Sequence, residues 1–286
     1  TNLTSDDSFA YAIEDSATAL LANGAGAPLT NAGAVTVSGD DAGTLSIADY
    51  TALTNLTSDD SFAYAIEDSA TGIVNASASV VTNANSTLLS GSADVTLNVA
   101  DADTLLARLT DATGLTLTVE DTASNLNGVV TAAVTSADNV VATTGTADIT
   151  GFDLSEVDAI EVASGETATV TVAQADKLTG AGSFNIVDTA AAVQAEFDAN
   201  GSGAGTILGE VGAIDIVDGV DGILAAGASS DALLSANTVT VDGSVNASQA
   251  DQLNAFVDNG IVNGGYLVKD TGANIVAGTF ITSGGA

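Results

Sequence analysis

The sequence predicts an α/β or mainly β repeat protein, a right-handed solenoid of parallel strands with short helices at the corners. The segment 1–18, TNLTSDDSFAYAIEDSAT, returns unchanged at 54–71, a step of 53 residues. Strand-like runs rich in Val, Ile and Thr alternate with short stretches of helical pattern, and 30 Gly residues suit many tight turns. A fixed period of this size is typical of stacked units that bury their apolar faces only against neighbours. We therefore expect 1–286 to form a single elongated repeat domain.

The first part of each step reads as a short strand, an Asp and a helical turn. In 11–20, YAIEDSATAL, Tyr11 and Ile13 alternate as in a half-buried strand, and Asp15 stands where an N-cap is expected. The Asp recurs at Asp15, Asp68, Asp121, Asp188, Asp218 and Asp270. We expect these residues to act as stacked helix caps, with a direct metal role as the alternative. The residues two positions earlier are predicted to stack in the core: Ile13, Ile66, Val119 and Ile186.

The second part of each step reads as a β-branched strand followed by a helix of small residues. It occurs at 35–53, 95–109, 170–178 and 239–253. Strands that alternate with brief helices favour parallel pairing through right-handed crossovers. The less regular stretch at 127–170 indicates further strands and a turn, and the Ser- and Gly-containing runs at 200–206 and 226–230 indicate loops.

The charge is almost entirely of one sign, with 37 acidic residues, three basic residues and a formal net charge of −34. The three basic residues are Arg108, Lys177 and Lys269. Nucleic-acid binding is excluded as a function class, because phosphate contacts require clustered Lys and Arg. An anionic membrane surface would repel the chain. Small cations are the expected partners, because they relieve the self-repulsion of a compact state with this charge.

The residue types that are missing argue against an enzyme. The chain has no Cys and no His, so it lacks thiolate ligands and the usual general base near neutral pH. Its Ser and Thr residues therefore have no His to activate them. A carboxylate pair of the glycosidase type is the alternative that the many Asp and Glu residues leave open. We predict no enzyme activity, no catalytic residues and no organic cofactor.

Acidic residues gather in turn-like segments and predict calcium sites between repeats. Calcium takes six to eight oxygen ligands from carboxylates, carbonyls and water, which paired Asp residues in turns can supply. The alternative is that Asp serves only as a turn and cap residue here. Neither an EF-hand loop nor the glycine-rich calcium nonapeptide occurs. The candidate metal ligands are Asp6, Asp7, Asp40, Asp41, Asp59, Asp60, Asp101, Asp103, Asp215, Asp218 and Asp221.

Several short motifs resemble those of a known group of proteins. The runs VDTAAAV, VKDTGAN and VTVAQADKL are similar to units of very large, repetitive bacterial surface proteins: calcium-dependent adhesins, S-layer-like proteins and extracellular-matrix proteins. The resemblance implies secretion, calcium and assembly at the cell surface. We accordingly expect an extracellular structural protein, a self-assembling filament, surface-layer or matrix subunit. The alternatives are the stalk of a large adhesin, a solenoid that binds or cleaves surface polysaccharide, and general halophilic adaptation, which explains the charge but not the repeat.

The two ends of the sequence carry the repeat pattern. The chain opens on a full copy of TNLTSDDSFAYAIEDSAT, and the segment 266–282 near its end has strand-like pattern. Exposed strand edges promote pairing with another chain, and end-to-end contact propagates as a filament. We therefore expect head-to-tail assembly with other copies of the chain. The alternative is excision from a longer precursor, in which neighbouring segments cover both ends.

Overall fold

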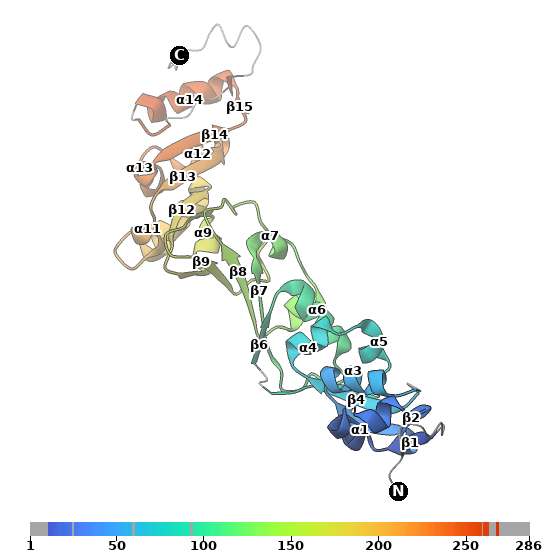
Figure 1. The fold of residues 1–286 in the computed structure, drawn as a ribbon. Helices are drawn as coiled ribbons and strands as arrows, with labels where there is room; N and C mark the ends of the chain where they lie inside the picture. Colours follow the sequence, from blue (N-terminus) through green and yellow to red (C-terminus); the bar gives the residue numbers. More distant parts are fainter. Residues whose placement is uncertain are drawn as a thin grey trace. The chain divides into compact units, whose positions relative to one another are not determined.

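The computed structural model describes residues 11–24, 26–58, 61–91, 94–258, 260–262 and 267–268. They belong to two compact units, drawn with their elements in Figure 1. The first unit lies within Thr1–Val119 and Val130–Asp138, and the second within Glu120–Val129 and Asn139–Ala286. The chain passes from the first unit into the second within strand β7 (Thr116–Thr122).

The first unit is built from short strands and helices that alternate along the chain. Its strands are β1 (Ala12–Asp15), β2 (Ala34–Val37), β3 (Asp41–Leu45), β4 (Ala63–Asp68), β5 (Thr87–Leu89), β6 (Asp94–Leu97) and the start of β7. Its helices are α1 (Ala17–Asn23), α2 (Ala27–Thr30), η1 (Ser38–Asp40), α3 (Ile47–Leu56), α4 (Ala70–Asn75), α5 (Ala78–Thr82), α6 (Val99–Arg108) and α8 (Ala132–Ser136).

Strand pairing in this unit is parallel and follows chain order. β1 pairs with β2, β4 lies between β3 and β5, and β6 pairs with β7. The sequence pattern joined β2 and β3 in one run. In the structure the chain bends between them at Gly39, which has a positive φ of 74°. A residue with a side chain rarely adopts that backbone conformation, so glycine permits the bend here.

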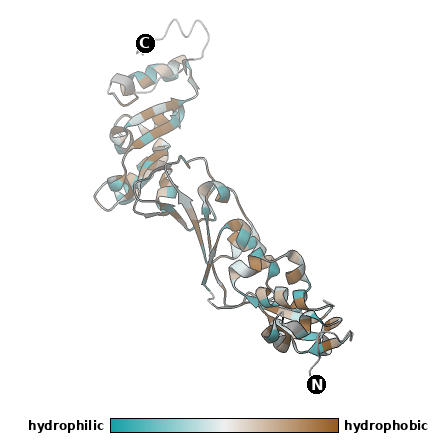
Figure 2. Ribbon diagram, viewed as in Figure 1, coloured by the Kyte–Doolittle hydropathy of each residue, from teal (hydrophilic) through white to brown (hydrophobic). Residues whose placement is uncertain are grey.

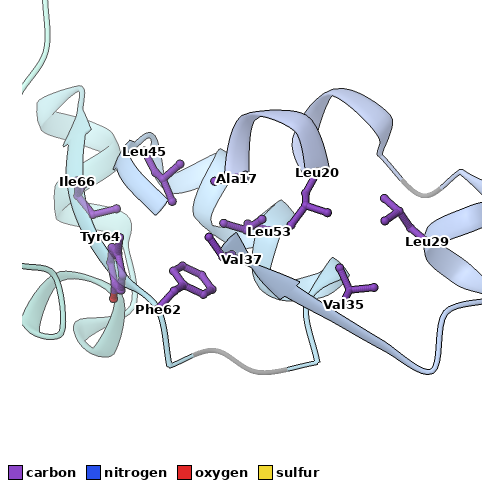
Figure 3. Close-up of a cluster of buried hydrophobic side chains, with 10 residues drawn as sticks. All are labelled: Ala17, Leu20, Leu29, Val35, Val37, Leu45, Leu53, Phe62, Tyr64 and Ile66. Atoms are coloured by element: carbon purple, nitrogen blue, oxygen red, sulfur yellow. The ribbon is translucent and has the colours of Figure 1, made fainter. Parts of the chain in front are cut away.

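The core of the first unit consists of small aliphatic side chains with a few aromatic rings. Figure 3 shows Leu20 and Leu53 from α1 and α3 facing strand residues such as Val35 and Val37, with Ile66 and Tyr64 further along. Leu53 and Ile66 are completely buried. Tyr64 is only 3% exposed, and its ring centroid lies 4.5 Å from that of Tyr50. The repeat thus buries its apolar face between elements of consecutive steps.

The 53-residue duplication is visible as a repeated set of elements and contacts. β1 and α1 recur as β4 and α4, and Asp15 and Asp68 end the two strands. The Tyr11 hydroxyl donates to the carbonyl of Pro28 at 2.7 Å, and the Tyr64 hydroxyl donates to the carbonyl of Val80 at 2.8 Å. The two copies therefore share tertiary contacts as well as secondary structure.

The second unit continues the same alternation. Its strands are the end of β7, β8 (Asn139–Thr144), β9 (Ala159–Val162), β10 (Thr167–Val170), β11 (Leu178–Gly180), β12 (Ser183–Asp188), β13 (Ile214–Gly219), β14 (Thr238–Asp242), β15 (Ser244–Val245) and β16 (Leu267–Val268). Its helices are α7 (Ala123–Leu126), α9 (Val172–Ala175), α10 (Ala190–Asn200), α11 (Ile207–Glu210), α12 (Val220–Ala226), α13 (Asp231–Ser235) and α14 (Ala247–Asp258).

Pairing in the second unit is parallel as well. β9 lies between β8 and β11, the order β10-β12-β13-β14 forms a four-stranded sheet, and β15 pairs with β16. Figure 2 shows hydrophobic and polar residues interleaved along these strands, as expected where one face is buried. Val170, Ile186 and Ile214 are register partners across three strands and are nearly or fully buried.

The structure confirms the predicted α/β class with parallel strands and short helices. The sheets are separate, so the solenoid remains a prediction, as does the single domain over 1–286. Ile66, Val119 and Ile186 are completely buried as predicted, whereas Ile13 is only partly buried against the core. The stretch at 127–170 contains three strands as expected, and residues 201–206 and 227–230 form loops.

Candidate functional site

The recurrent Asp lies one residue before the helix cap, so its predicted place as the N-cap is wrong by one position. The N-caps are Ser16, Ser69, Thr122 and Thr189 in four copies and Gly219 in a fifth. Each Ser or Thr hydroxyl accepts the N–H three residues later, which satisfies one of the amides left open at a helix start. Asp270 lies outside the described residues.

Instead of capping its own helix, the Asp carboxylate bridges the start of that helix and the start of an earlier one. In Asp68, Oδ1 accepts the N–H of Ser69 at 2.7 Å and Oδ2 accepts the N–H of Ile47 at 2.8 Å. Ile47 is the first residue of α3, the helix before β4 in the chain. The carboxylate thus binds an amide that the helix leaves unsatisfied, at the positive end of the helix dipole.

The same bridge occurs twice in the second unit. Asp188 accepts the N–H of Thr189 at 2.7 Å and that of Val172, the first residue of α9, at 3.0 Å. Asp218 accepts the N–H of Gly219 at 2.8 Å and that of Ala190, the first residue of α10, at 3.0 Å. We refer to Asp68, Asp188 and Asp218 as the bridging aspartates. The contact explains why the position recurs while its neighbours change.

A second polar contact links a residue that precedes one strand to a residue of an earlier strand. In each case a residue's N–H donates to the carbonyl of a partner, and its side-chain oxygen accepts that partner's N–H. Asp138 does this with Leu117, and Asn237 does it with Ile214. Among the described residues the contact joins Ser58 with Val35, Thr110 with Thr87, Asp138 with Leu117, Asp158 with Val140, and Asn237 with Ile214.

Sequence reasoning missed this second contact. Its signal is a Ser, Thr, Asp or Asn shortly before each strand, a residue type that is also usual in turns. The side-chain oxygen accepts the N–H of the partner residue, the role that a backbone carbonyl has within a sheet. For Asp138, Asp158 and Asn237, whose following strands pair with the strand that is contacted, parallel pairing is thereby extended at the beginning of the strand.

Two of the three basic residues bind backbone carbonyls. The Arg108 guanidinium Nη1 lies 2.6 Å, 3.0 Å and 2.9 Å from the carbonyl oxygens of Ile73, Val74 and Ala76, around the end of α4. A cation at a helix carboxyl end is favourable because the last carbonyls have no partner within the helix. This contact ties α6 to α4.

Lys177 binds the carbonyl oxygens of a turn in the second unit. Its Nζ donates to the carbonyls of Leu154 and Val157 at 3.0 Å and 2.7 Å, with Ser155 at 3.4 Å. Arg108 and Lys177 therefore each donate hydrogen bonds to a group of backbone carbonyl oxygens. The third base, Lys269, lies outside the described residues.

Several candidate metal ligands lie outside the described residues, and the others form hydrogen bonds with different parts of the chain. Asp6, Asp7, Asp59 and Asp60 lie outside the described residues, as does the side chain of Asp40. Asp41 accepts the N–H of Gly43 in a local turn. Asp101 accepts from the Asn98 side chain at the start of α6, whereas Asp103 accepts the N–H of Ala133 in α8. The last two carboxylates therefore have different partners.

The spaced acidic run at 215–221 is also divided among different partners. Asp215 accepts the Thr238 hydroxyl at 2.6 Å, Asp218 is a bridging aspartate, and Asp221 accepts from Gln249 Nε2 at 3.0 Å. Among the residues that the structure describes, no group of three or more Asp or Glu is arranged to hold a metal ion. Calcium binding therefore stays a prediction.

Among the described residues, each unit has an open surface hollow. One, of about 230 Å³, is lined by Leu88, Leu109, Leu115 and a turn that contains Asp111. Hydrogen bonds from the Thr113 hydroxyl and N–H lower the pKa of Asp111. The other, of about 240 Å³, lies beside Phe152 and Lys177, whose ammonium group already binds carbonyls.

The chain matches no protein-family model, no curated protein and no solved structure. None of the helices in the described ranges is long and apolar enough to cross a bilayer.

Proposed function

We propose that this chain is a structural protein of the cell exterior, a self-assembling filament, surface-layer or matrix subunit. Its repeats would stack as a right-handed solenoid of parallel strands. Parallel pairing that largely follows chain order supports this arrangement, as in β3-β4-β5 and β6-β7-β8-β9, although β11 pairs with β9 and β10 pairs with β12.

The observation that carries the proposal is the bridge made by Asp68, Asp188 and Asp218. Each of these carboxylates accepts the first amide of an earlier helix and the N–H of the cap residue of the helix that follows its own strand. The side chain that recurs most regularly in the sequence thus links successive repeats. A chain whose repeated polar residue serves that purpose is suited to extending a stack.

Calcium is proposed as the stabilising cation. The chain has a net charge of −34, and its described bases, Arg108 and Lys177, bind carbonyl oxygens. Bound divalent cations would lower the mutual repulsion of the carboxylates. Carboxylate oxygens such as those of Asp41, at the start of β3, are ligands of the kind that calcium prefers.

The test is assembly and melting of the full chain in millimolar calcium, in chelator, and in magnesium at matched ionic strength. We expect calcium to raise Tm, because a ligand at about a hundred times its Kd stabilises a fold by about 2.7 kcal/mol. Light scattering and negative-stain images should show elongated assemblies. Equal Tm values in all three buffers would contradict the calcium proposal, and a strictly monomeric chain at high concentration would contradict self-assembly.

A further inference from the structure

The chain carries several copies of Asn-x-Ser/Thr, the acceptor motif for N-linked sugars. A transferase has to reach the Asn amide and the hydroxyl two residues later at the same time. A folded chain therefore offers only those copies in which both groups are accessible. The copies within the described ranges begin at Asn55, Asn75, Asn85, Asn200 and Asn246, and the copy at Asn2 lies outside them.

The copy at Asn75 stands at the link between two helices. Asn75 is the last residue of α4, and α5 begins at Ala78 (Figure 1). Ala76 (φ −61°, ψ 151°) and Ser77 (φ −63°, ψ 144°) have extended backbone, so the motif leaves the helix after its first residue. Asn75 and Ser77 are both exposed.

The polar side chains of this copy are available for a reaction. Within the described ranges no hydrogen bond engages the Asn75 amide, and the Ser77 hydroxyl contacts that of the exposed Ser79 at 3.3 Å. The backbone around Asn75 is nevertheless fixed, because Arg108 donates to the carbonyls of Ile73, Val74 and Ala76. The fold thus holds the motif in place without using its reactive groups.

Helical structure and burial restrict two of the other copies. Asn55 and Leu56 lie within α3, where side chains two residues apart do not face each other, and the Thr57 hydroxyl donates to the Leu53 carbonyl at 3.1 Å. Asn85 is exposed, but its partner Thr87 belongs to β5 and is only 2% exposed. Neither copy presents its amide and its hydroxyl together.

Hydrogen bonds occupy the Asn side chain in the remaining two. The attacking atom of Asn200, Nδ2, already donates to Oε1 of the buried Glu196 at 2.9 Å. Asn246 Oδ1 accepts the N–H of Gln249 at 2.9 Å at the start of α14, so movement of this side chain would uncap the helix. Asn75 therefore stands apart among the described copies.

We propose that Asn75 is the acceptor of an N-linked glycan in the folded chain. Asn75 Nδ2 attacks the anomeric carbon of an oligosaccharide carried on a polyprenyl diphosphate. The bond from that carbon to the diphosphate oxygen breaks, the diphosphate leaves with the electron pair, and Nδ2 gives up one proton. The site goes beyond the proposed assembly, and its use in the cell rests on the proposed exterior location, where such sugars are found.

The test incubates the purified full-length chain with a polyprenyl-diphosphate oligosaccharide and an oligosaccharyltransferase that requires only Asn-x-Ser/Thr. Intact mass gives the number of sugars, and peptide mapping locates them. We expect one glycan, at Asn75. Asn75→Gln and Ser77→Ala should each abolish it, whereas Ser77→Thr should keep it. Asn83→Gln is the matched control, because Asn83 is exposed in the same part of the chain but begins no motif.

The fold of the variants and the competence of each motif are checked separately. Asn75→Gln should melt at the wild-type Tm, because the side chain is exposed and makes no hydrogen bond in the described ranges. Synthetic peptides that each carry one motif provide the unfolded reference, and all of them should accept sugar.

Three results would overturn the assignment. They are an Asn75 peptide that takes no sugar, a folded chain that takes none while the peptide does, and a folded chain modified at Asn85 or Asn246 as readily as at Asn75. Assembly and calcium binding are measured on the unmodified chain, so failure of the proposed function and failure of this acceptor site are separate outcomes.

Discussion

Replacing Asp188 by Asn isolates the contribution of one bridge to stability. Asp188 accepts the N–H of Thr189 at 2.7 Å and the N–H of Val172 at 3.0 Å. Asn has nearly the same shape but only one acceptor oxygen, so one of the two amides loses its partner. The side-chain NH₂ group then faces a backbone N–H, a contact between two donors.

The expected loss follows from the strength of such contacts. A hydrogen bond to a charged group contributes about 1.5–3 kcal/mol, and Asp188 is only partly buried, which favours the lower end. We therefore expect Asp188→Asn to reduce the free energy of unfolding by about 2 kcal/mol. For a unit of this size, that corresponds to a Tm decrease of about 4–8 °C.

The matched control is Asp198→Asn in α10. Asp198 is exposed and accepts only from the Gln194 side chain, within the same helix. Both substitutions remove one negative charge, so any general relief of repulsion is the same in the two variants. Asp198→Asn should change stability by less than about 0.5 kcal/mol.

Urea unfolding gives the difference in free energy between these variants, and hydrogen exchange locates it. The amides of Val172 and Thr189 should lose protection in Asp188→Asn and keep it in Asp198→Asn. Equal unfolding midpoints for the two variants would refute the reasoning, because they would show that the bridge adds nothing beyond its charge.

Further predictions concern the cation–carbonyl contacts and the buried tyrosine. Arg108→Met should cost about 2–4 kcal/mol in urea unfolding because three carbonyls lose a charged donor, and Arg108→Lys, which keeps the charge, should recover part of it. Burial, together with the hydrogen bond to Tyr50, raises the pKa of Tyr64 above its usual value. The folded state therefore keeps this proton where the unfolded state releases it, so the contribution of Tyr64 to stability should be constant below about pH 10 and fall above it. Tyr64→Phe should flatten that fall in unfolding midpoints measured between pH 8 and 11; an equally steep decline would contradict the assignment.

Local patterns in the sequence predicted much of the fold. The alternation of Tyr11 and Ile13, followed by Asp-Ser and small residues, predicts a strand and then a helix, and β1 and α1 follow that order. The 53-residue step predicts that β4 and α4 repeat them. These features depend on side-chain periodicity and residue size, which a single sequence displays.

The position of the cap could not be predicted in the same way. Asp and Ser are both good N-cap residues, and the pair stands together in Asp15-Ser16 and Asp68-Ser69. The choice is decided by Ile47, which donates its amide to Asp68 from 21 residues away. Likewise, Arg108 reaches carbonyls 32 to 35 residues earlier. Contacts at such separations depend on how the strands stack, which local pattern does not specify.

The bridging aspartates also bear on how a chain of net charge −34 stays folded. Each carboxylate adds to long-range repulsion but gains two hydrogen bonds at 2.7–3.0 Å. Repulsion between exposed charges is screened beyond about 8 Å at 0.15 M ionic strength, whereas contacts at hydrogen-bond distance are screened much less. Added salt therefore weakens the repulsion that each aspartate adds and leaves its two hydrogen bonds largely unchanged.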